Sequence, residues 1–393
     1  MRLIELAGNA KTALKKALLS ASKNVWRAPL TRANSIDLLK DSVVFAKQSP
    51  PVHLPKLAPV NAGNVHHPEE IRAFRPDYVW QVTVGGPIQS LTICRSGGLL
   101  ANKKWLLDLD FTSTAGLLDS PIKKKWDKYP LVIAPWSHFW KGFYDYTTFV
   151  VGKLCRIESV YGPDIWQQAK ICYPLQHTQY EREFLEKLGI PKSSIIDTAP
   201  YWGTAIEAES VIVANNHLTW CSSLSDMMLL RNRFRSSLPI AATEKKKLYL
   251  SRKGRRRVLN EGQVREIMAT YGIEVIEDEP HSLDEQIHLF QNASVIVAPH
   301  GAALTNLLWC DEGTQVMEFF AGSYTPNFYY YMCTMLGLKY DFLVDYSAGS
   351  RHNHWANVAD DIVVDIDTLK DKLNQILLQE QSAVHEHKTL NHK

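Results

Sequence analysis

Long apolar runs are absent from this sequence of 393 residues. No stretch of about 18 consecutive apolar residues occurs, so the sequence predicts no membrane-spanning helix. The N-terminus also lacks an uninterrupted apolar core, which argues against a secretory signal. A formal net charge of +3 is too small to indicate a nucleic-acid-binding protein by itself. With 45% hydrophobic and 22% charged residues, the composition is typical of a soluble globular protein with room for two domains.

Two kinds of cofactor motif are also missing. The six cysteines are scattered without a C-x-x-C pair, and several lie in apolar runs, which is typical of buried reduced thiols in a reducing compartment. The phosphate-binding pattern G-x-G-x-x-G does not occur, which disfavours a dinucleotide-dependent dehydrogenase. These absences indicate an intracellular type of protein without a dinucleotide cofactor.

The most informative stretch is residues 292–320, which read NASVIVAPHGAALTNLLWCDEGTQVMEFF. The order of apolar runs, small residues and acidic turn predicts strand, tight turn, helix, turn and strand, which is a βαβ unit. The first peptide N–H groups of such a helix are unpaired and carry partial positive charge. Gly301 and the alanines after it would let a ligand approach closely. The stretch therefore predicts an anion site, with diphosphate as the usual ligand, although many turns of this kind only pack.

The same string resembles the signature of glycosyltransferase family 61. In that family a buried strand runs into a His-Gly-Ala turn, an L-T-N helix start and a strand ending in a glutamate, and residues 300–306 and Glu318 match this order. The resemblance extends over residues 130–345 and is best over residues 249–320. It implies an α/β fold of the GT-B type, with two Rossmann-like domains facing across a cleft. It also implies transfer of a sugar from a nucleotide-sugar donor.

A basic segment, SRKGRRRVLNEG, follows the strand predicted at residues 248–250. Ligands of open α/β sheets bind beyond the carboxyl ends of strands, and the planar guanidinium group matches phosphate oxygens. Family 61 carries a comparable segment, which maps onto Arg252, Arg257, Asn260 and Glu261. The alternative interpretations are a solvated basic loop and a nucleic-acid patch.

Further donor contacts are expected around the turn. His300 is expected to donate to the diphosphate or the sugar, although a histidine in a turn often only caps a helix. Thr305 and Asn306 lie in the first helical turn, within reach of a nucleotide. An unpaired buried carboxylate is costly, so we expect Glu318 to accept from both ribose hydroxyls, with a salt bridge to Arg252 or Arg257 as the structural alternative. The predicted donor site comprises Arg252, Arg257, Asn260, His300, Gly301, Ala302, Thr305, Asn306 and Glu318.

The segment LVIAPWSHFWKGFYDYTTFVVGKLCRI, residues 131–157, is expected to hold the acceptor and the general base. Family 61 has an N-Y-Y-H-W-type segment here that faces the cleft. The phase of the aromatic residues sets Asp145 where the family usually has histidine. We therefore expect Asp145 as the first candidate for the base and His138 as the second.

A possible metal site lies earlier in the chain. Asp108 and Asp110 imitate the D-x-D pair that holds a metal–diphosphate in other glycosyltransferases, and alternation places both acids on one strand face. A helix N-terminus and arginines can neutralise the leaving group in a GT-B enzyme instead. We therefore expect neither a divalent metal nor another cofactor to be required.

The predicted organisation has four parts: an N-terminal helix with an irregular segment (1–60), an acceptor-binding domain (61–240), a nucleotide-sugar-binding domain (245–365), and a terminal helix with a polar tail (366–393). Residues 1–26 show a basic amphipathic pattern that could lie on an anionic membrane, and packing on the protein's own domain is the alternative. Residues 380–393 are expected to be disordered.

The sequence favours an inverting glycosyltransferase that moves a sugar to a hydroxyl of a glycan or glycolipid acceptor, in the synthesis of a polysaccharide such as a capsule. The expected location is the cytoplasm or the inner surface of the membrane. An alternative is a non-catalytic subunit of a polysaccharide-assembly complex that binds a nucleotide-sugar or glycan. A nucleic-acid binder would require steep salt dependence, and no nucleic-acid partner is expected.

Overall fold

The computed structural model describes residues 30, 32–64, 66–94, 97–106, 125–135, 141–199, 204–217, 220–235, 245–347 and 357–390. Three predicted features lie outside these residues: the helix at 1–26, the pair Asp108 and Asp110, and His138. The chain divides into two compact units. Unit 1 comprises Met1–Pro50 and Phe74–Arg233, and unit 2 comprises Pro51–Ala73 and Phe234–Lys393.

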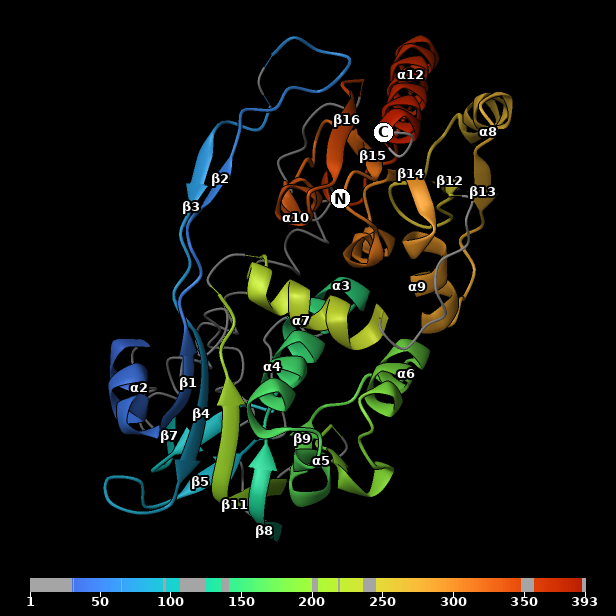
Figure 1. Cartoon of the computed structure of the whole chain (residues 1–393). Helices are drawn as coiled ribbons and strands as arrows, with labels where there is room; N and C mark the ends of the chain where they lie inside the picture. Colours follow the sequence, from blue (N-terminus) through green and yellow to red (C-terminus); the bar gives the residue numbers. More distant parts are fainter. Residues whose placement is uncertain are drawn as a thin grey trace, which may run out of the picture. The chain divides into compact units, whose positions relative to one another are not determined.

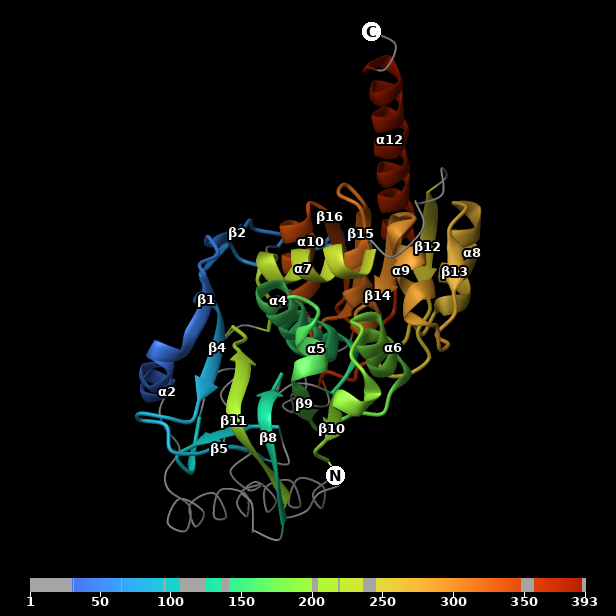
Figure 2. The same ribbon diagram turned by 60° about the horizontal axis from the view of Figure 1, so that its bottom comes forward.

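Unit 1 is built on a mixed sheet of nine strands within the described part of the chain. Strands β10, β9, β8 and β11 are parallel in that order, and β11 also pairs antiparallel with β4 and β5 (Figure 1 and Figure 2). The described strands are β1 (Val43–Lys47), β4 (Asp77–Thr83), β5 (Leu91–Ile93), β6 (Leu99–Ala101), β7 (Lys104–Trp105), β8 (Lys125–Ile133), β9 (Lys170–Tyr173), β10 (Ile195–Asp197) and β11 (Thr204–Ala214).

Helices precede, connect and follow the strands of unit 1. They are α2 (Arg32–Leu39), η1 (Lys40–Ser42), α3 (Phe143–Asp145), η3 (Tyr146–Val151), α4 (Gly152–Tyr161), α5 (Ile165–Gln168), α6 (Gln179–Lys187), η4 (Lys192–Ser194) and α7 (Leu224–Arg235), whose last two residues belong to unit 2. The segment η3 is a π-helix between α3 and α4, and all six of its residues are buried. Such π-helical turns are rare in proteins as a whole, and many of those that occur lie at functional sites.

A buried polar network joins the elements of unit 1. Arg156 on α4 donates from Nε to Asp226 on α7 at 2.9 Å, and its Nη2 lies 3.3 Å from Asp77 at the start of β4. Asp77 also contacts His217 Nε2 at 2.7 Å and accepts from Ser223 at 2.8 Å. All five side chains are buried. A helix pair, a strand and the loop after β11 are thereby fixed to one another.

Unit 2 contains a fully parallel sheet of five strands in the order β13, β12, β14, β15, β16 (Figure 1). Every residue of β15 is buried, as expected for a central strand with both faces covered. The elements are β12 (Lys246–Leu250), α8 (Glu261–Thr270), β13 (Glu274–Ile276), α9 (Leu283–Gln291), β14 (Ala293–Pro299), η5 (Ala302–Trp309), β15 (Gln315–Ala321), α10 (Phe328–Leu336), β16 (Lys339–Asp345) and α12 (Ile366–Leu390).

A segment from early in the chain, residues 51–73, packs with unit 2. We call it the strap. It contains the antiparallel pair β2 (Val52–Leu54) and β3 (Glu70–Arg72). The amide N–H of Val60 donates to Phe342 at 2.8 Å, and Tyr330 donates to the carbonyl oxygen of Pro55 at 2.7 Å. The sequence analysis placed this segment in the N-terminal half, because nothing in its own residues indicates a long-range partner.

The expected α/β class is confirmed, and so are the strand predicted at residues 248–250 and the two strands predicted within residues 292–320, which correspond to β12, β14 and β15. Two local predictions need correction. The helix after His300 is a 3-10 helix, in which the amide of Leu304 bonds to the carbonyl oxygen of Gly301. The helix α12 continues to Leu390 (Figure 2), so residues 380–390 are helical, which agrees with their many good helix formers. The sequence analysis also missed α10.

Two composition-based expectations can be compared with the structure. All six cysteines are free and buried, as predicted from their apolar surroundings. Within the described residues, no helix combines the length and the apolar character needed to cross a membrane.

We expect Asp226→Ala to lower the free energy of unfolding of unit 1 by about 3–5 kcal/mol, because it leaves the charge of Arg156 buried without its main partner. Chemical denaturation of purified protein would measure this. Glu209→Ala is a matched control, since Glu209 forms an ion pair with Lys128 in which both side chains are more than 60% exposed. Equal losses in the two variants would show that the buried network is not a stability determinant.

Candidate functional site

A buried chain of three polar side chains lies at the centre of unit 2. His300 follows β14, and its Nδ1 lies 2.5 Å from Oε1 of Glu318 on β15. Tyr340 on β16 donates its hydroxyl to Oε2 of the same carboxyl group at 2.5 Å. Glu318 is 0% exposed, so both of its oxygens are held by protein groups and neither is open to a ligand. The hydrogen bonds among Tyr340, Glu318 and His300 therefore orient the imidazole ring.

The protonation states of Glu318 and His300 follow from their burial. Burial raises the pKa of Glu318 to about 8, although the hydrogen bond from Tyr340 and the charge of Arg256 both act to lower it. The pKa of His300 lies well below its usual value because the ring is buried and three nearby arginines repel an imidazolium. At neutral pH a protonated Glu318 donates to Nδ1, which leaves the ring proton on Nε2. No described residue is a hydrogen-bond partner of Nε2, and the side chain is 6% exposed.

Aromatic rings surround His300. Phe320 stacks on it at 5.1 Å between ring centroids, and Tyr329 and Tyr324 lie at 5.4 and 5.6 Å. The loop that carries Tyr324 is held by the strap, where His66 Nε2 lies 2.5 Å from the hydroxyl of Thr325. The aromatic side chains exclude water from the imidazole and strengthen its electrostatic interactions.

Two arginines of the basic segment lie close to this ring. A Cβ atom at Gly301 would stand 1.7 Å from Nη1 of Arg252, so any side chain at this position would displace the guanidinium group. The backbone of Gly301 is extended, a conformation open to every residue, and glycine is therefore required for the close approach alone. Arg252 donates from Nε to the carbonyl oxygen of Arg255 at 2.6 Å.

Arg256 is the second arginine. Its guanidinium lies 5.8 Å from the centroid of the Tyr324 ring, and its Nε is buried without a hydrogen-bond partner. Burial and the charges of Arg252 and Arg255 lower the pKa of Arg256 to about 10, so the group is still cationic at neutral pH. Its backbone is left-handed, at φ 60°, which is costly for a non-glycine residue and frequent at functional sites. Within the described residues, no carboxylate forms an ion pair with Arg252 or Arg256.

Other predicted donor residues lie elsewhere or are engaged. Arg257 is 57% exposed and pairs with Asp361 at 3.0 Å. Asn260 bonds the backbone N–H and C=O of Val364 at 3.0 and 2.8 Å, which fixes the start of α8 to the segment before α12. Neither residue joins the cluster around His300.

The polar side chains of η5 are committed to the protein. Thr305 donates to the carbonyl oxygen of Ala302 at 2.6 Å, which stabilises the first turn. Asn306 donates to Gln286 at 2.9 Å and accepts from Trp309 at 2.9 Å. Thr305 and Asn306 are each 1% exposed, so the structure gives them a role in shaping the helix that follows His300.

In unit 1, Asp145 ends α3 immediately before the π-helical segment. It is half-buried, and its charge contributes to raising the pKa of the Tyr180 hydroxyl, for which burial is the largest cause. Tyr180 donates to Gln176 Oε1 at 2.8 Å, and the amide of Gly142 donates to the same oxygen at 3.3 Å. The turn before Asp145 is thus tied to α6, which fixes the position of the carboxylate.

Three residues of the unit 2 cluster were missed by the sequence analysis: Arg256, Tyr324 and Tyr340. The run of three arginines, residues 255–257, indicated a basic site, but the sequence does not show that Arg256, whose backbone is left-handed, is the member of the run that contacts Tyr324. Tyr340 is on a neighbouring strand, and nothing local marks it as the partner of Glu318. Within the described residues, no group of three or more His, Cys, Asp or Glu side chains is gathered to hold a metal ion.

A comparison with protein-family models matches residues 105–317, more than half of the chain, to the family described as Glycosyltransferase 61. The chain belongs to glycosyltransferase family 61. It is therefore a glycosyltransferase, with a sugar donor and an acceptor as substrates. A search of curated proteins gives no match. The matched range includes Asp145, the basic segment and His300, and it ends one residue before Glu318.

In this family 61 enzyme, the buried carboxyl group makes stability depend on pH. Because the pKa of Glu318 is raised on folding, its contribution is fully present below about pH 4.5 and is lost as the pH rises through about 8. We expect the difference in melting temperature between the wild type and Glu318→Gln to change in favour of the variant as the pH rises from about 4.5 to about 8. Scanning calorimetry at pH 5, 6.5 and 8 would measure it, and a difference independent of pH would contradict the assignment.

Proposed function

We propose that this glycosyltransferase uses a nucleotide-sugar donor, and that unit 2 binds its diphosphate. The observation that carries the proposal is the pair Arg252, which is half-buried, and Arg256, which is buried, because neither cation has a carboxylate partner among the described residues. Buried charges are normally paired, and Arg256 also has an unpartnered Nε. A diphosphate would supply the missing anion, and guanidinium groups match its oxygens in geometry and charge.

His300 would complete the donor site. With the ring proton on Nε2, the imidazole can donate to a diphosphate oxygen and stabilise the leaving group as its charge develops. Glu318 acts through His300 in this proposal and does not contact the ribose, since Tyr340 and His300 already occupy its two oxygens. Gly301 is needed so that Arg252 can lie beside the turn.

The acceptor hydroxyl would be deprotonated in unit 1 by Asp145, with His138 as the second candidate. A base that activates the hydroxyl as it attacks the anomeric carbon, while the diphosphate leaves from the opposite side, gives inversion in one displacement. The proposal keeps the GT-B arrangement implied by the family resemblance, in which each domain supplies one substrate. Synthesis of a polysaccharide or glycoconjugate in the cytoplasm or at the membrane surface is part of the same proposal.

The first test concerns the donor site. We expect Arg252→Ala and Arg256→Ala each to weaken binding of inorganic pyrophosphate roughly 10- to 150-fold, because a charge-assisted hydrogen bond contributes about 1.5–3 kcal/mol. Arg257→Ala is the matched control, since Arg257 belongs to the same loop but pairs with Asp361. Isothermal titration calorimetry would measure the affinities. Unchanged affinity in folded Arg252→Ala and Arg256→Ala would remove the diphosphate site from this cluster.

The second test concerns the base. We expect Asp145→Asn to lower kcat at least about a hundredfold, the lower end of general-base effects, while pyrophosphate affinity is kept. His138→Ala should cost less. An aspartate base leaves the rate flat down to about pH 5, whereas a histidine base loses it through roughly pH 6.5. An inactive His138→Ala beside an active Asp145→Asn would reverse the assignment.

The third test concerns metal. Because the arginines would neutralise the leaving group, we propose that no divalent metal is required. Transfer should persist in EDTA, and the double variant Asp108→Asn, Asp110→Asn should retain most of the rate. Loss of transfer in chelator that added manganese restores would contradict this proposal and favour the D-x-D interpretation.

A further inference from the structure

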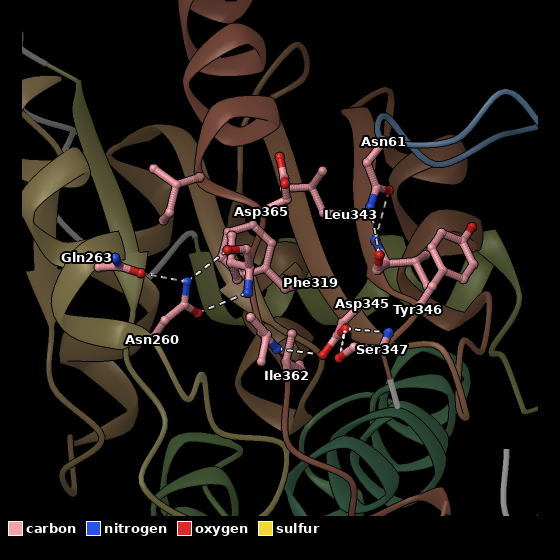
Figure 3. Close-up of a pocket in the computed structure, with 14 residues that line it drawn as sticks. Asn61, Asn260, Gln263, Phe319, Leu343, Asp345, Tyr346, Ser347, Ile362 and Asp365 are labelled. Carbon is pink, nitrogen blue, oxygen red and sulfur yellow. Dashed lines mark hydrogen bonds between the residues drawn. The ribbon is translucent and has the colours of Figure 1, made fainter. Parts of the chain in front are cut away.

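A second candidate site in unit 2 is a cavity of about 420 Å³, a size within the range of small-molecule pockets. It lies at the carboxyl ends of β15 and β16 and beside the start of α12 (Figure 3). Phe319, Leu343 and Ile362 form its apolar floor. Successive strand residues point to opposite faces of a sheet, so Phe319 faces this cavity and Glu318 faces His300. The cavity is therefore separate from the donor cluster.

Two asparagines build the frame of the cavity. Asn61 of the strap donates to the carbonyl oxygen of Val344 at 2.7 Å and accepts from its amide at 3.2 Å. Asn260 makes the same two-way contact with Val364. Asp345 accepts from the amide of Val363 at 2.7 Å and from Ser347. Backbone segments that are distant in sequence are thus fixed in place before any ligand arrives, which lowers the entropic cost of binding.

Three lining side chains keep unused hydrogen-bonding groups. Gln263 and Tyr346 lie on opposite sides of the cavity (Figure 3), and neither the amide nitrogen of Gln263 nor the hydroxyl of Tyr346 has a partner among the described residues. Asp365 accepts from the amide of Thr368 at 2.8 Å and also hydrogen-bonds the side chain of Thr368. A carboxylate has about four acceptor positions, so it can still accept further hydrogen bonds. The ring of Tyr346 points away from the other labelled residues (Figure 3), so the cavity offers a carboxylate and an amide to a ligand above an apolar floor.

The charge of the lining restricts the ligand. Among the described residues, the lining of the cavity includes two carboxylates, Asp345 and Asp365, and no lysine, arginine or histidine. The N-terminus of α12, which would otherwise attract an anion, already has Asp365 as its negative group. Arg257 is on the neighbouring loop, but its guanidinium is paired with Asp361. A phosphate or another anion is disfavoured here, in contrast to the cluster around His300.

We propose that this cavity binds a neutral sugar ring through its vicinal hydroxyl groups. The hydroxyls would donate to Asp365 and accept from the amide nitrogen of Gln263, while the C–H face of the ring would lie on the apolar floor. Two substrates of the proposed function carry such a ring: the ribose of the donor nucleotide and a sugar unit of a glycan acceptor. The inference rests on the proposed function for these two sources, whereas the cavity and its charge do not depend on it.

Saturation-transfer NMR measures the binding of two sets of neutral probes to the full chain. The first set comprises the nucleosides uridine, cytidine, guanosine and adenosine, and the second comprises the methyl glycosides of glucose, galactose, mannose and N-acetylglucosamine. We expect saturable binding of one set. Val363 lines the cavity and is 43% exposed, so Val363→Trp should fill the cavity and weaken binding at least tenfold without unfolding the protein. Val363→Ala is the matched control and should bind as the wild type does.

Asp365→Ser provides a second variant. Serine keeps the hydrogen bond that begins α12 but removes the carboxylate, so we expect weaker sugar binding at an unchanged melting temperature. Binding of nucleosides would assign the ring to the donor, and binding of glycosides would assign it to the acceptor. Absence of saturable binding in both sets, or equal binding in Val363→Trp and wild type, would overturn the inference. Pyrophosphate affinity should stay unchanged in Val363→Trp, so this result is separate from the test of the donor site.

Discussion

The organisation of unit 2 depends on one buried carboxyl group shared between two neighbours. The parallel register sets Glu318 beside Phe342 and Ala298, so that His300, two residues after Ala298, and Tyr340, two residues before Phe342, reach it from adjacent strands. A carboxyl group in this position is stable only when it is protonated or fully hydrogen-bonded. The sheet thereby fixes both the orientation of the imidazole and the nitrogen that carries its proton.

Positive charge is placed around this ring by backbone features and not by ion pairs. The missing side chain of Gly301 makes room for Arg252. Arg256 has a left-handed backbone, and its guanidinium lies 5.8 Å from the centroid of the Tyr324 ring. The strap adds a constraint from a distant part of the chain, through the contact of His66 with Thr325. A cationic site assembled in this way costs stability when it is empty, and binding of an anion would recover that cost.

Much of this architecture could be predicted from the sequence because strand and helix periods are local. Residues 248–344 alternate in a way that predicts the parallel sheet, and the His300 turn marks the carboxyl end of its central strand. The roles within the site were harder to predict. Arg257 was expected to bind the donor, but in the structure it pairs with Asp361, and it is the charge of Arg256 that acts on His300. Glu318 was expected to bind ribose, and its partner Tyr340 becomes visible only when β16 pairs with β15.

The central claim is that Glu318 holds His300 so that a proton on Nε2 faces the donor diphosphate. Nitrogen-15 NMR of histidine-labelled protein tests it most directly, with the His300 signals assigned by their loss in His300→Gln. The account predicts a protonated Nε2 at pH 7, a shift of its signal on addition of inorganic pyrophosphate, and transfer of the ring proton to Nδ1 as the pH rises through about 8. A bare Nε2 at pH 7, or a signal that pyrophosphate leaves unchanged, would contradict it.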